Sequence, residues 1–374
     1  MIYDVAILGA GASGLFLAAN LQHKNVLLLE HNLTVGAKIA VSGGGRANVT
    51  NEVMDESRYF AGDPTFVKKV LDRFDNRALL EWLVKRGCRP VVAKPRQYFC
   101  PKSAKELIAA LKRESRAKLV VGAKIKYVRP GFQIGTSKGV FAANNVVVAT
   151  GGLSFKKLGA SGVGYEIAKS FGHGITPLRP ALVGFTVQPQ QFWFKELSGI
   201  SLKAHVKVGQ KHFFDHILFA HRGISGPAIL NASLYWEKGE IEIAFIKNVW
   251  RFLQNPKKIL STQLPLPKRF VKTFLAHIGV RDIQLGRLSE DERKRLGAFE
   301  SYKFAPAGTF GFERAEVTKG GVVLDEIDPL SMQSKLHKGL YFIGEVLDVT
   351  GELGGYNFQW AFSSAWVAKE ALTH

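Results

Sequence analysis

Hydrophobic and polar positions near the N-terminus follow the pattern of a βαβ unit. Residues 3–8 form a mostly apolar run, which is typical of a parallel strand covered on both faces. Residues 12–23 have helical spacing, and residues 26–30 form a second short apolar run. The pattern therefore predicts a strand, a helix and a second strand, as at the start of a Rossmann-type α/β domain.

The next segments alternate between irregular and helical patterns. Residues 36–51 show no clear period and are expected to form a loop. Asp63 followed by Pro64 is typical of a helix N-cap and first helical position. Apolar side chains within residues 67–78 then share one face, and Gly87 is expected to end this helical region.

A second helix and two strands are predicted further along. Ser103 and Glu106 have the spacing of a capping box, and an apolar helical face follows them. Residues 119–128 and 146–149 have the composition of strands.

The pattern changes near residue 177 and changes back near the C-terminus. Residues 179–247 are β-rich with glycine turns, and residues 248–305 are helical and basic. A strand at 339–343 and a long apolar helix at 355–372 follow. We therefore expect a discontinuous domain of residues 1–178 and 319–374, with residues 179–318 as an inserted domain.

Composition excludes several classes of protein. The chain has 374 residues, of which 46% are hydrophobic, so it has enough apolar side chains for a large core and is not mainly disordered. Two cysteines cannot form a disulfide framework. The N-terminus lacks the pattern of a signal peptide, and no apolar run is long enough for a membrane helix, so we expect a cytoplasmic protein without membrane contact.

The formal net charge of +20 is unevenly distributed along the chain. Residues 61–130 carry 18 basic and 6 acidic side chains, and residues 248–305 carry 12 and 5. Residues 1–60 and 306–374 are slightly acidic, with 4 basic against 5 acidic and 5 against 9. A solvated basic surface is the favoured interpretation, and attraction of anionic substrates or RNA is the alternative.

Three glycines and one acid form a dinucleotide-binding pattern. Gly9, Gly11 and Gly14 follow the first strand as G-x-G-x-x-G and open the first helix. The first glycine permits a tight turn, the second permits approach of the pyrophosphate, and the third permits close packing of helix and strand. Glu30 ends the second strand, where an acid binds ribose hydroxyls and repels a 2′-phosphate. The pattern predicts FAD or NAD, and not NADP.

Three later features favour FAD. Residues 149–152, Ala-Thr-Gly-Gly, follow a strand and form a turn beside the first loop in many flavoproteins. Gly344 and Glu345 end another strand, where an acid can bind ribityl hydroxyls. Residues 354–357 open the last helix, whose N-terminus can stabilise negative charge on a reduced flavin.

The chain resembles the BaiN-like, or aminoacetone oxidase-like, family of NAD(P)/FAD-dependent flavoproteins over nearly its full length. The motifs that carry the resemblance are GAGASGL at 9–15, VSGGGRANVTN at 41–51, YFCPKSA at 98–104, ATGG at 149–152, GYEIAKSFGH at 164–173, LFAHRGISGPAIL at 218–230, TKGGV at 318–322 and GLYFIGEVLDVTGELGGYNFQWAFSSA at 339–365. Two positions depart from the family pattern. Ala47 stands where the family usually has a cysteine, and Val163 stands where the family often has an acid.

The resemblance implies a split FAD domain with an insert of β-barrel and helical parts. It also implies FAD contacts in the first loop, the SGGGR segment and the later turns. These residues are Gly9, Gly11, Ala12, Ser13, Gly14, Glu30, Lys38, Ser42, Gly43, Gly44, Arg46, Thr150, Gly151, Gly344, Glu345, Gly355, Tyr356 and Asn357. Consecutive small residues in SGGGR would expose backbone N–H groups to phosphate or flavin, and Arg46 can bind phosphate oxygens.

The other motifs do not indicate a further nucleotide, redox or metal site. There is no second G-x-G-x-x-G, so NAD(P)H could serve as electron donor only without a dedicated domain. Cys88 and Cys100 lack the spacing of a redox pair and are expected to be structural. His212 and His216 have metal-ligand spacing only on a helix, and their segment is β-like, so no metal is expected.

No sequence feature identifies a proton donor. The turn at residues 221–227 could bind an anionic substrate or be an ordinary start of a helix.

The leading hypothesis is an FAD-dependent oxidoreductase that transfers hydride between flavin N5 and a small organic substrate. Family members include reductases of unsaturated steroid ketones and an amine-type oxidase. The alternatives are a flavoprotein that acts on RNA and a flavin-binding protein without turnover.

Overall fold

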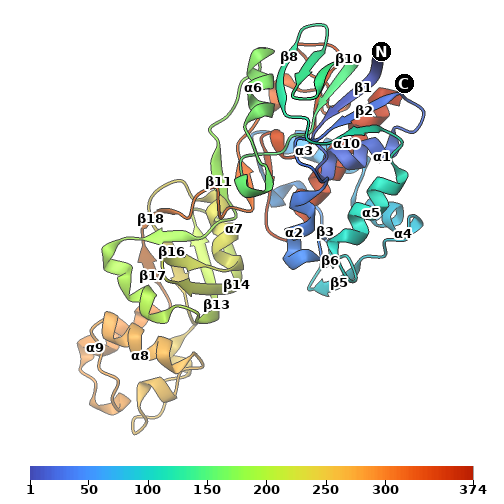
Figure 1. Cartoon of the computed structure of the whole chain (residues 1–374). Coiled ribbons are helices and arrows are strands. Elements are labelled where there is room, and N and C mark those ends of the chain that lie inside the picture. Colours follow the sequence, from blue (N-terminus) through green and yellow to red (C-terminus); the bar gives the residue numbers. More distant parts are fainter. Residues whose placement is uncertain (374) are drawn as a thin grey trace. The chain divides into compact units, whose positions relative to one another are not determined.

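The structure, a computed structural model, describes residues 1–373. The chain divides into two compact units, which can be followed by colour in Figure 1. The first unit combines residues 1–180 with the residues from 316 onward, and the insert unit comprises residues 181–315.

A seven-stranded sheet forms the centre of the first unit. Five strands run parallel in the order β7, β2, β1, β10 and β20. The sheet is extended by β9, which pairs antiparallel with β10, and by β8, which pairs antiparallel with β9. Their bounds are β1 Ile2–Leu8, β2 Val26–Leu29, β7 Lys118–Val120, β8 Ile125–Arg129, β9 Gln133–Thr136, β10 Gly139–Val148 and β20 Leu340–Phe342. All four residues of β2 and all three of β20 are buried, as expected for strands covered on both faces. The predicted Rossmann-type α/β class is confirmed.

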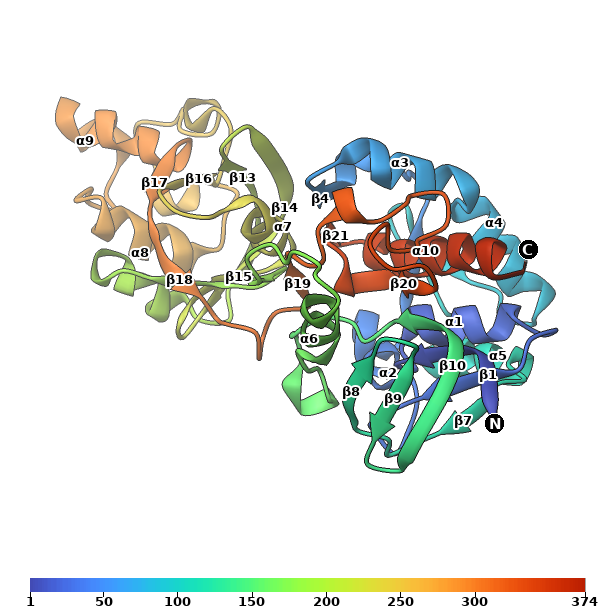
Figure 2. The same ribbon diagram turned by 90° about the horizontal axis from the view of Figure 1, so that it is seen from above.

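Helices from both ends of the chain build the core around this sheet. Their bounds are α1 Ala12–Asn20, α2 Ala37–Gly45, α3 Pro64–Arg73, α4 Asn76–Lys85, α5 Ala104–Glu114, α6 Val163–Ser170 and α10 Tyr356–Thr373. Figure 2 shows α10 alongside α1, and Phe16 of α1 contacts the ring of Phe362 at 5.0 Å and that of Trp82 at 4.8 Å between centroids. The residues before and after the insert therefore share one hydrophobic core.

Three small sheets complete the first unit. β3 (Asn48–Asn51), β6 (Gln97–Phe99) and β5 (Val91–Lys94) form an antiparallel sheet, and β4 (Tyr59–Ala61) pairs with β21 (Val349–Gly351). β11 (Arg179–Ala181) pairs with β19 (Val317–Lys319), where the chain enters and leaves the insert.

Some sequence predictions were wrong in detail. The segment 36–51, expected to be a loop, contains α2 and β3. The helical face expected over 67–78 is divided between α3 and α4, because the Asp75 side chain accepts the Ala78 N–H and begins a new helix. The strand expected over 119–128 is interrupted at Gly122, whose φ of +68° belongs to a turn.

The insert unit contains a second seven-stranded sheet, and this sheet is antiparallel throughout. Its order is β17, β16, β13, β14, β15, β12 and β18. The bounds are β12 Phe185–Val187, β13 Ser201–Val208, β14 Lys211–Ala220, β15 Gly223–Ser225, β16 Ile241–Ala244, β17 Tyr302–Phe304 and β18 Pro306–Thr309. Only Ala305 separates the two end strands, so the sheet curls and brings both edges to one segment of chain.

Aromatic side chains fill the core of the insert unit, and the rings of Phe270, Phe274 and Phe299 pack together. Its helices are α7 Pro227–Tyr235, α8 Lys268–His277 and α9 Glu290–Arg295. Residues 248–305, predicted to be helical, contain α8, α9, short 3-10 turns and the strand β17, and prolines interrupt the segment.

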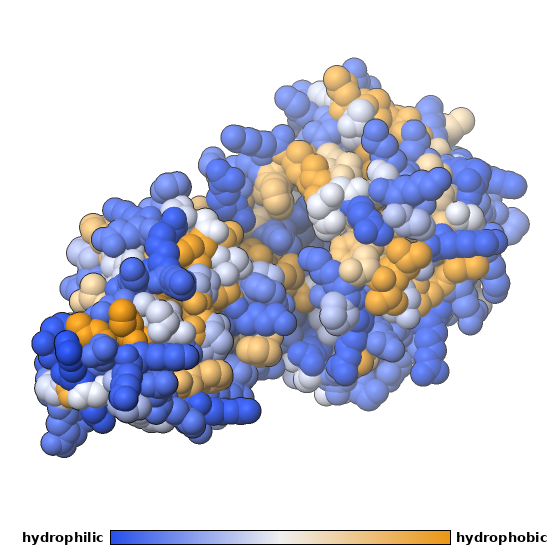
Figure 3. All heavy atoms as spheres, turned by 90° about the horizontal axis from the view of Figure 1, so that it is seen from below, coloured by the Kyte–Doolittle hydropathy of each residue, from blue (hydrophilic) through white to orange (hydrophobic). Residues whose placement is uncertain are grey.

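Hydrophilic residues cover most of the face of each unit that Figure 3 shows, and hydrophobic residues form separate patches there. None of the helices within residues 1–373 is long and apolar enough to cross a membrane.

Candidate functional site

The ends of four parallel strands lie in one row of the sheet. Leu8 of β1 is level with Leu29 of β2 and with Val148 of β10, and Val148 is level with Phe342 of β20. The loops that follow these strands therefore leave the sheet at the same edge. This edge is the usual ligand-binding position of open α/β sheets. It brings together the first glycine loop, Glu30, the turn at 149–152 and the pair at 344–345.

Close packing fixes the first glycine loop. Gly9 has a φ of +106°, and a Cβ there would lie 2.5 Å from the carbonyl oxygen of Ala149. A Cβ on Gly14 would overlap the carbonyl oxygen of Gly9. Gly11 is the N-cap of α1, so no side chain of the N-cap residue accepts a hydrogen bond from the first N–H groups of the helix. A Cβ on Gly11 would meet nothing within 4 Å. The N-terminus of α1 therefore faces open space with its N–H groups available, as a pyrophosphate requires.

Glu30 is buried and held in one orientation. Its Oε2 accepts a hydrogen bond from the Ala10 N–H at 2.8 Å, and its Oε1 accepts one from the Asn32 N–H at 2.8 Å. Nδ1 of His31 lies 3.2 Å from Oε1. The carboxylate thus lies beside the glycine loop with lone pairs left for ribose hydroxyls.

The SGGGR segment forms a kinked helix end instead of a loop. Gly43, Gly44 and Gly45 have φ values of +55°, +67° and +84°, and the buried Ala47 has a φ of +46°. Such a run of left-handed residues turns successive backbone N–H groups to one side and can form an anion-binding concavity. The Arg46 Nε donates to the carbonyl oxygen of Cys100 at 3.1 Å, so part of its guanidinium already has a partner.

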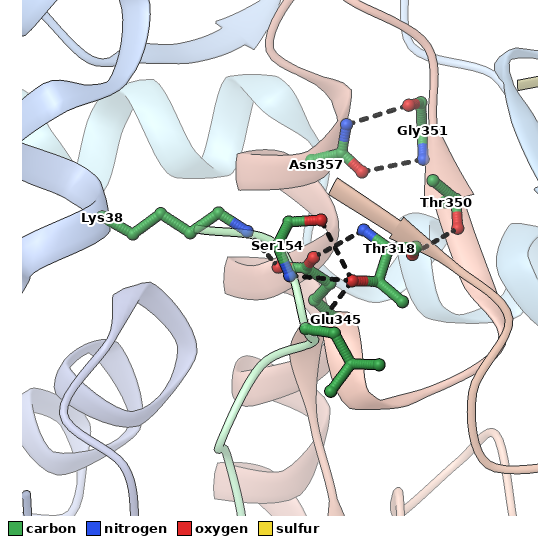
Figure 4. A network of polar contacts seen from close by, with 8 residues as sticks. Lys38, Ser154, Thr318, Glu345, Thr350, Gly351 and Asn357 are labelled. Carbon is green, nitrogen blue, oxygen red and sulfur yellow. Dashed lines mark hydrogen bonds and ion pairs between the residues drawn. The ribbon is translucent and has the colours of Figure 1, made fainter. Parts of the chain in front are cut away.

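Glu345 lies at the centre of a polar network (Figure 4). Lys38, on the first turn of α2, places its Nζ 2.6 Å from Oε2 of Glu345. The Thr318 N–H donates to Oε1 of Glu345 at 2.9 Å. Oγ1 of Thr318 accepts from the N–H groups of Leu153 at 2.8 Å and Ser154 at 3.2 Å. The network ties the α2 segment, the turn after β10 and the end of β20 together.

Thr318 was missed as a site residue by sequence reasoning. It is a buried polar residue in a short strand, with no spacing that indicates a role. The only signal was its place in the TKGGV motif.

The start of α10 is held by its own side chains. The Asn357 amide donates to the carbonyl oxygen of Gly351 and accepts from its N–H, both at 2.9 Å (Figure 4). Asn357 therefore braces the turn before the helix. Gly355 has a φ of +100°, and a Cβ there would lie 2.6 Å from the carbonyl oxygen of Thr50. The Tyr59 hydroxyl donates to the carbonyl oxygen of Tyr356 at 3.0 Å.

Burial shifts the titration of nearby side chains. Burial raises the pKa of Tyr356 to about 12, and neighbouring Arg58 opposes this shift. Burial likewise raises the pKa of the Asp348 carboxyl above its ordinary value, while a hydrogen bond from Thr176 and the charge of Lys319 act in the opposite direction. The Tyr356 hydroxyl is therefore neutral at physiological pH.

Several polar atoms at this edge are buried without a hydrogen-bond partner among residues 1–373. They are Nε2 of His31, Oγ1 of Thr150, the hydroxyl of Tyr165 and Oδ1 of Asp348. Unpaired buried polar groups are costly unless a ligand or water satisfies them. Together with the open space at Gly11 and Gly44, these atoms fit a polar dinucleotide cofactor such as FAD.

The other candidate residues from the sequence do not form a comparable site. Cys88 and Cys100 are buried and reduced, with their Sγ atoms 3.9 Å apart. His212 and His216 lie on the strand β14, and the described residues contain no group of His, Cys, Asp or Glu that could hold a metal ion. The turn at 221–227 belongs to the insert unit and contains β15 and the first residue of α7.

A family model described as "HI0933-like protein Rossmann domain" matches residues 3–371. The chain is 38% identical to the ribosomal RNA dihydrouridine synthase of Haemophilus influenzae, with 98% of both chains covered. It is 36% identical to the protein of the same name from Escherichia coli, with 99% of this chain and 98% of that one covered.

A third relative has a different described activity. The 3-dehydro-bile acid delta(4,6)-reductase of Clostridium scindens is 31% identical, with 98% of both chains covered. Among solved structures, the 3-ketosteroid delta1-dehydrogenase of Sterolibacterium denitrificans has the same fold, with a TM-score of 0.52, 12% identity and 99% of each chain covered.

Proposed function

Since the chain belongs to the HI0933-like family of Rossmann flavoproteins and is an FAD-dependent oxidoreductase, we propose that it reduces uridine to dihydrouridine in ribosomal RNA. The observation that carries this proposal is the basic charge of the chain, taken with the two relatives of that name. A net charge of +20 is suited to a polyanionic substrate, whereas a bile acid carries only a single carboxylate. The RNA alternative therefore becomes the leading hypothesis.

The two activities named for the relatives belong to one reaction class. In uracil, the C5–C6 double bond is conjugated with the C4 carbonyl, and a 3-oxo steroid with a Δ4 double bond has the same arrangement. Reduction adds hydride to the carbon β to the carbonyl and a proton to the α carbon. Reduced FAD supplies the hydride when it is bound. Relatives that act on different substrates of this class can therefore share the same hydride transfer and differ in the surface that binds the substrate.

We assign FAD binding to the first unit, along the edge where the four parallel strands end. The N-terminus of α1 with Gly11 would bind the pyrophosphate, Glu30 the adenosine ribose, and Glu345 the ribityl chain. Lys38 holds the Glu345 carboxylate in place, as the distance of 2.6 Å indicates. The N-terminus of α10, braced by Asn357, would lie at the flavin ring and stabilise negative charge there.

The remaining residues predicted to contact FAD belong to the same loops. We propose backbone contacts to FAD from the first loop, the SGGGR segment and the turns at 149–152 and 344–357. These residues are Ala12, Ser13, Ser42, Gly43, Gly44, Arg46, Thr150, Gly151, Gly344, Gly355 and Tyr356. NAD(P)H would reduce the flavin without a second dinucleotide domain, since the chain has only one G-x-G-x-x-G.

The proposal is tested with purified protein loaded with FAD. The protein is incubated with NADPH or NADH and with ribosomal RNA transcribed in vitro, which lacks modified bases. Digested RNA is then searched by mass spectrometry for uridine that has gained two hydrogens. We expect dihydrouridine at a defined position, and none from heat-inactivated protein. A flavin that is reduced by the nucleotide while the RNA remains unmodified would contradict the proposal.

A second candidate function is reduction of a small conjugated ketone, which the Clostridium relative favours. The same reduced protein is mixed anaerobically with a panel of steroid enones and dienones. Rapid reoxidation of the flavin by an enone, together with no reaction with RNA, would favour this second function.

A further inference from the structure

The hairpin of β5 and β6 presents basic side chains close to the turn that precedes α10. All residues of β5 are exposed, and Val92 is 57% exposed. Lys94, Pro95 and Arg96 form the tip, and Arg96 has a left-handed φ of +63°. The Glu52 N–H donates to the carbonyl oxygen of Arg96 at 2.7 Å, which fixes the backbone of the tip, and Arg96 is an exposed residue.

The base of this hairpin contacts the glycine turn. β6 pairs with β3, in which Asn51 is level with Gln97. The Asn51 amide donates to the carbonyl oxygen of Gly354 at 2.9 Å, and a Cβ on Gly354 would lie 3.6 Å from Cδ of Gln97. The basic tip is therefore one residue away from a side chain that lines the turn at 351–355.

A second arginine reaches the same turn from another segment. Arg58 precedes β4, and its Nη1 lies 3.2 Å from Oε2 of the buried Glu352. The Glu352 N–H donates to the carbonyl oxygen of Arg58 at 2.9 Å. The charges of both Arg58 and Arg96 act on the hydroxyl of Tyr356 and oppose the rise of its pKa. Two guanidinium groups from separate segments thus lie near one glycine turn.

This arrangement suits phosphodiester groups more than a neutral ligand. Arginine binds phosphate through paired N–H groups, and lysine adds a point charge. Enzymes that modify a base act on single-stranded nucleic acid or turn the target base out of a duplex, and contacts with the phosphates on both sides of that nucleotide would fix its position. The hairpin also lies in residues 61–130, the most basic part of the chain.

We propose that Lys94 and Arg96 at the tip of the β5–β6 hairpin, together with Arg58, bind RNA phosphates that flank the target nucleotide and so place its base at the 351–355 turn. This inference rests on the proposed function and names the surface that recognises the substrate. The hairpin residues position the RNA and take no part in the hydride transfer.

The test compares K94E/R96E with the control R116E. Arg116 is exposed and precedes β7, which is parallel to β2, so it lies at the opposite edge of the sheet from the glycine loops. Binding of a fluorescent ribosomal RNA transcript is measured over a range of salt concentrations, and dihydrouridine formation is measured over a range of RNA concentrations. FAD absorbance and thermal unfolding report on the fold, and K94Q/R96Q replaces the first variant if that variant binds no FAD.

We expect the hairpin variant to raise KM for RNA about tenfold with a smaller change in kcat. The slope of log affinity against log salt should fall by about 1.4, which corresponds to two lost contacts with single-stranded RNA. R116E should keep the wild-type KM. Arg58→Lys, which retains the charge beside Glu352, should raise KM less than the hairpin variant does.

The outcomes separate this inference from the proposed function. If wild-type protein forms dihydrouridine and K94E/R96E has the same KM and salt slope as R116E, the hairpin surface is wrong and the proposed function stands. If wild-type protein neither binds nor modifies the transcript, both are wrong.

Discussion

Two glycine-containing segments at the same edge of the sheet depend on glycine for different reasons. In the loop from Gly9 to Gly14, neighbouring backbone leaves no room for a Cβ at either end. In the segment from Gly43 to Ala47, every residue except Arg46 has a left-handed backbone, but a Cβ on Gly44 would meet nothing within 4 Å. Glycine is therefore required for space at Gly14, and for its dihedral angles at Gly44. Substitutions can separate the two requirements.

The largest effect is expected from Gly14→Ala. The added methyl group would overlap the carbonyl oxygen of Gly9 and push α1 away from β1. We expect the free energy of unfolding to fall by about 3 kcal/mol, with loss of most bound FAD. Denaturant unfolding and the visible absorbance of the purified protein measure both quantities.

Gly11→Ala is the matched control within that loop. No atom lies within 4 Å of its Cβ position, so the fold should be unchanged while FAD binding weakens. Equal losses of stability in the two variants would show that crowding is not what distinguishes Gly14.

A smaller effect is expected from Gly44→Ala. The methyl group has room, but a left-handed φ of +67° costs a non-glycine residue about 1 kcal/mol. Gly44→Asn should lose less stability, because asparagine tolerates this conformation better. Urea unfolding of both variants checks the order, and an asparagine variant less stable than the alanine variant would contradict the dihedral explanation.

Lys38→Met tests whether the ion pair with Glu345 holds the kinked segment at the site. The side chain of Lys38 is 36% exposed, so solvent screens the pair, and we expect a loss of only about 0.5 kcal/mol. FAD affinity should fall a few-fold because the Glu345 carboxylate loses one of its partners. Lys38→Arg should restore most of the affinity in a titration of apoprotein with FAD. If Lys38→Met binds FAD as wild type does, the pair has no positioning role.

The smallest effect at neutral pH is expected from Tyr356→Phe, at a third glycine turn of this edge. The folded-state pKa of Tyr356 is raised to about 12 from an ordinary value of 10.0. The unfolded chain therefore loses its proton first, and wild-type protein loses stability as the pH rises from about 10 to 12. The phenylalanine variant should match wild type at pH 7 and lose less stability across that range. Urea unfolding at several pH values measures the difference, and identical alkaline slopes would contradict it.

The local structure of the first of these two segments could be predicted from the sequence, and that of the second, which was expected to be a loop, could not. Gly9, Gly14 and Glu30 follow from local spacing, because strand, tight turn and helix are consecutive in the chain. The turns at 149–152 and 344–345 could be added because parallel strands end at a common edge. The kinked α2 gave no periodic signal, since three glycines replace the side chains that would show one.

The rest of the site could not be predicted, because it depends on contacts between segments that are far apart in the sequence. β3 is a strand because it pairs with β6, almost fifty residues later in the chain, and nothing within 48–51 reveals this partner. Thr318 contributes through hydrogen bonds to Leu153 and Ser154, which lie in a distant segment. Asn357 was expected among the cofactor contacts, and the structure shows in addition that its amide is hydrogen-bonded to the backbone of Gly351. Cofactor contacts of the individual predicted residues remain a proposal.

The shared core of the first unit has a consequence for synthesis on the ribosome. Strand β20 and helix α10 come after the whole insert, and β10 and Phe16 need them as packing partners. The first 180 residues therefore leave the ribosome with an incomplete sheet, which cannot be completed until the insert has been translated. The insert has its own core and can fold during that time. Cofactor capture is thus a late event that follows translation of α10, and a nascent chain that stalls before this helix exposes the Phe16 side of α1 to chaperones and proteases.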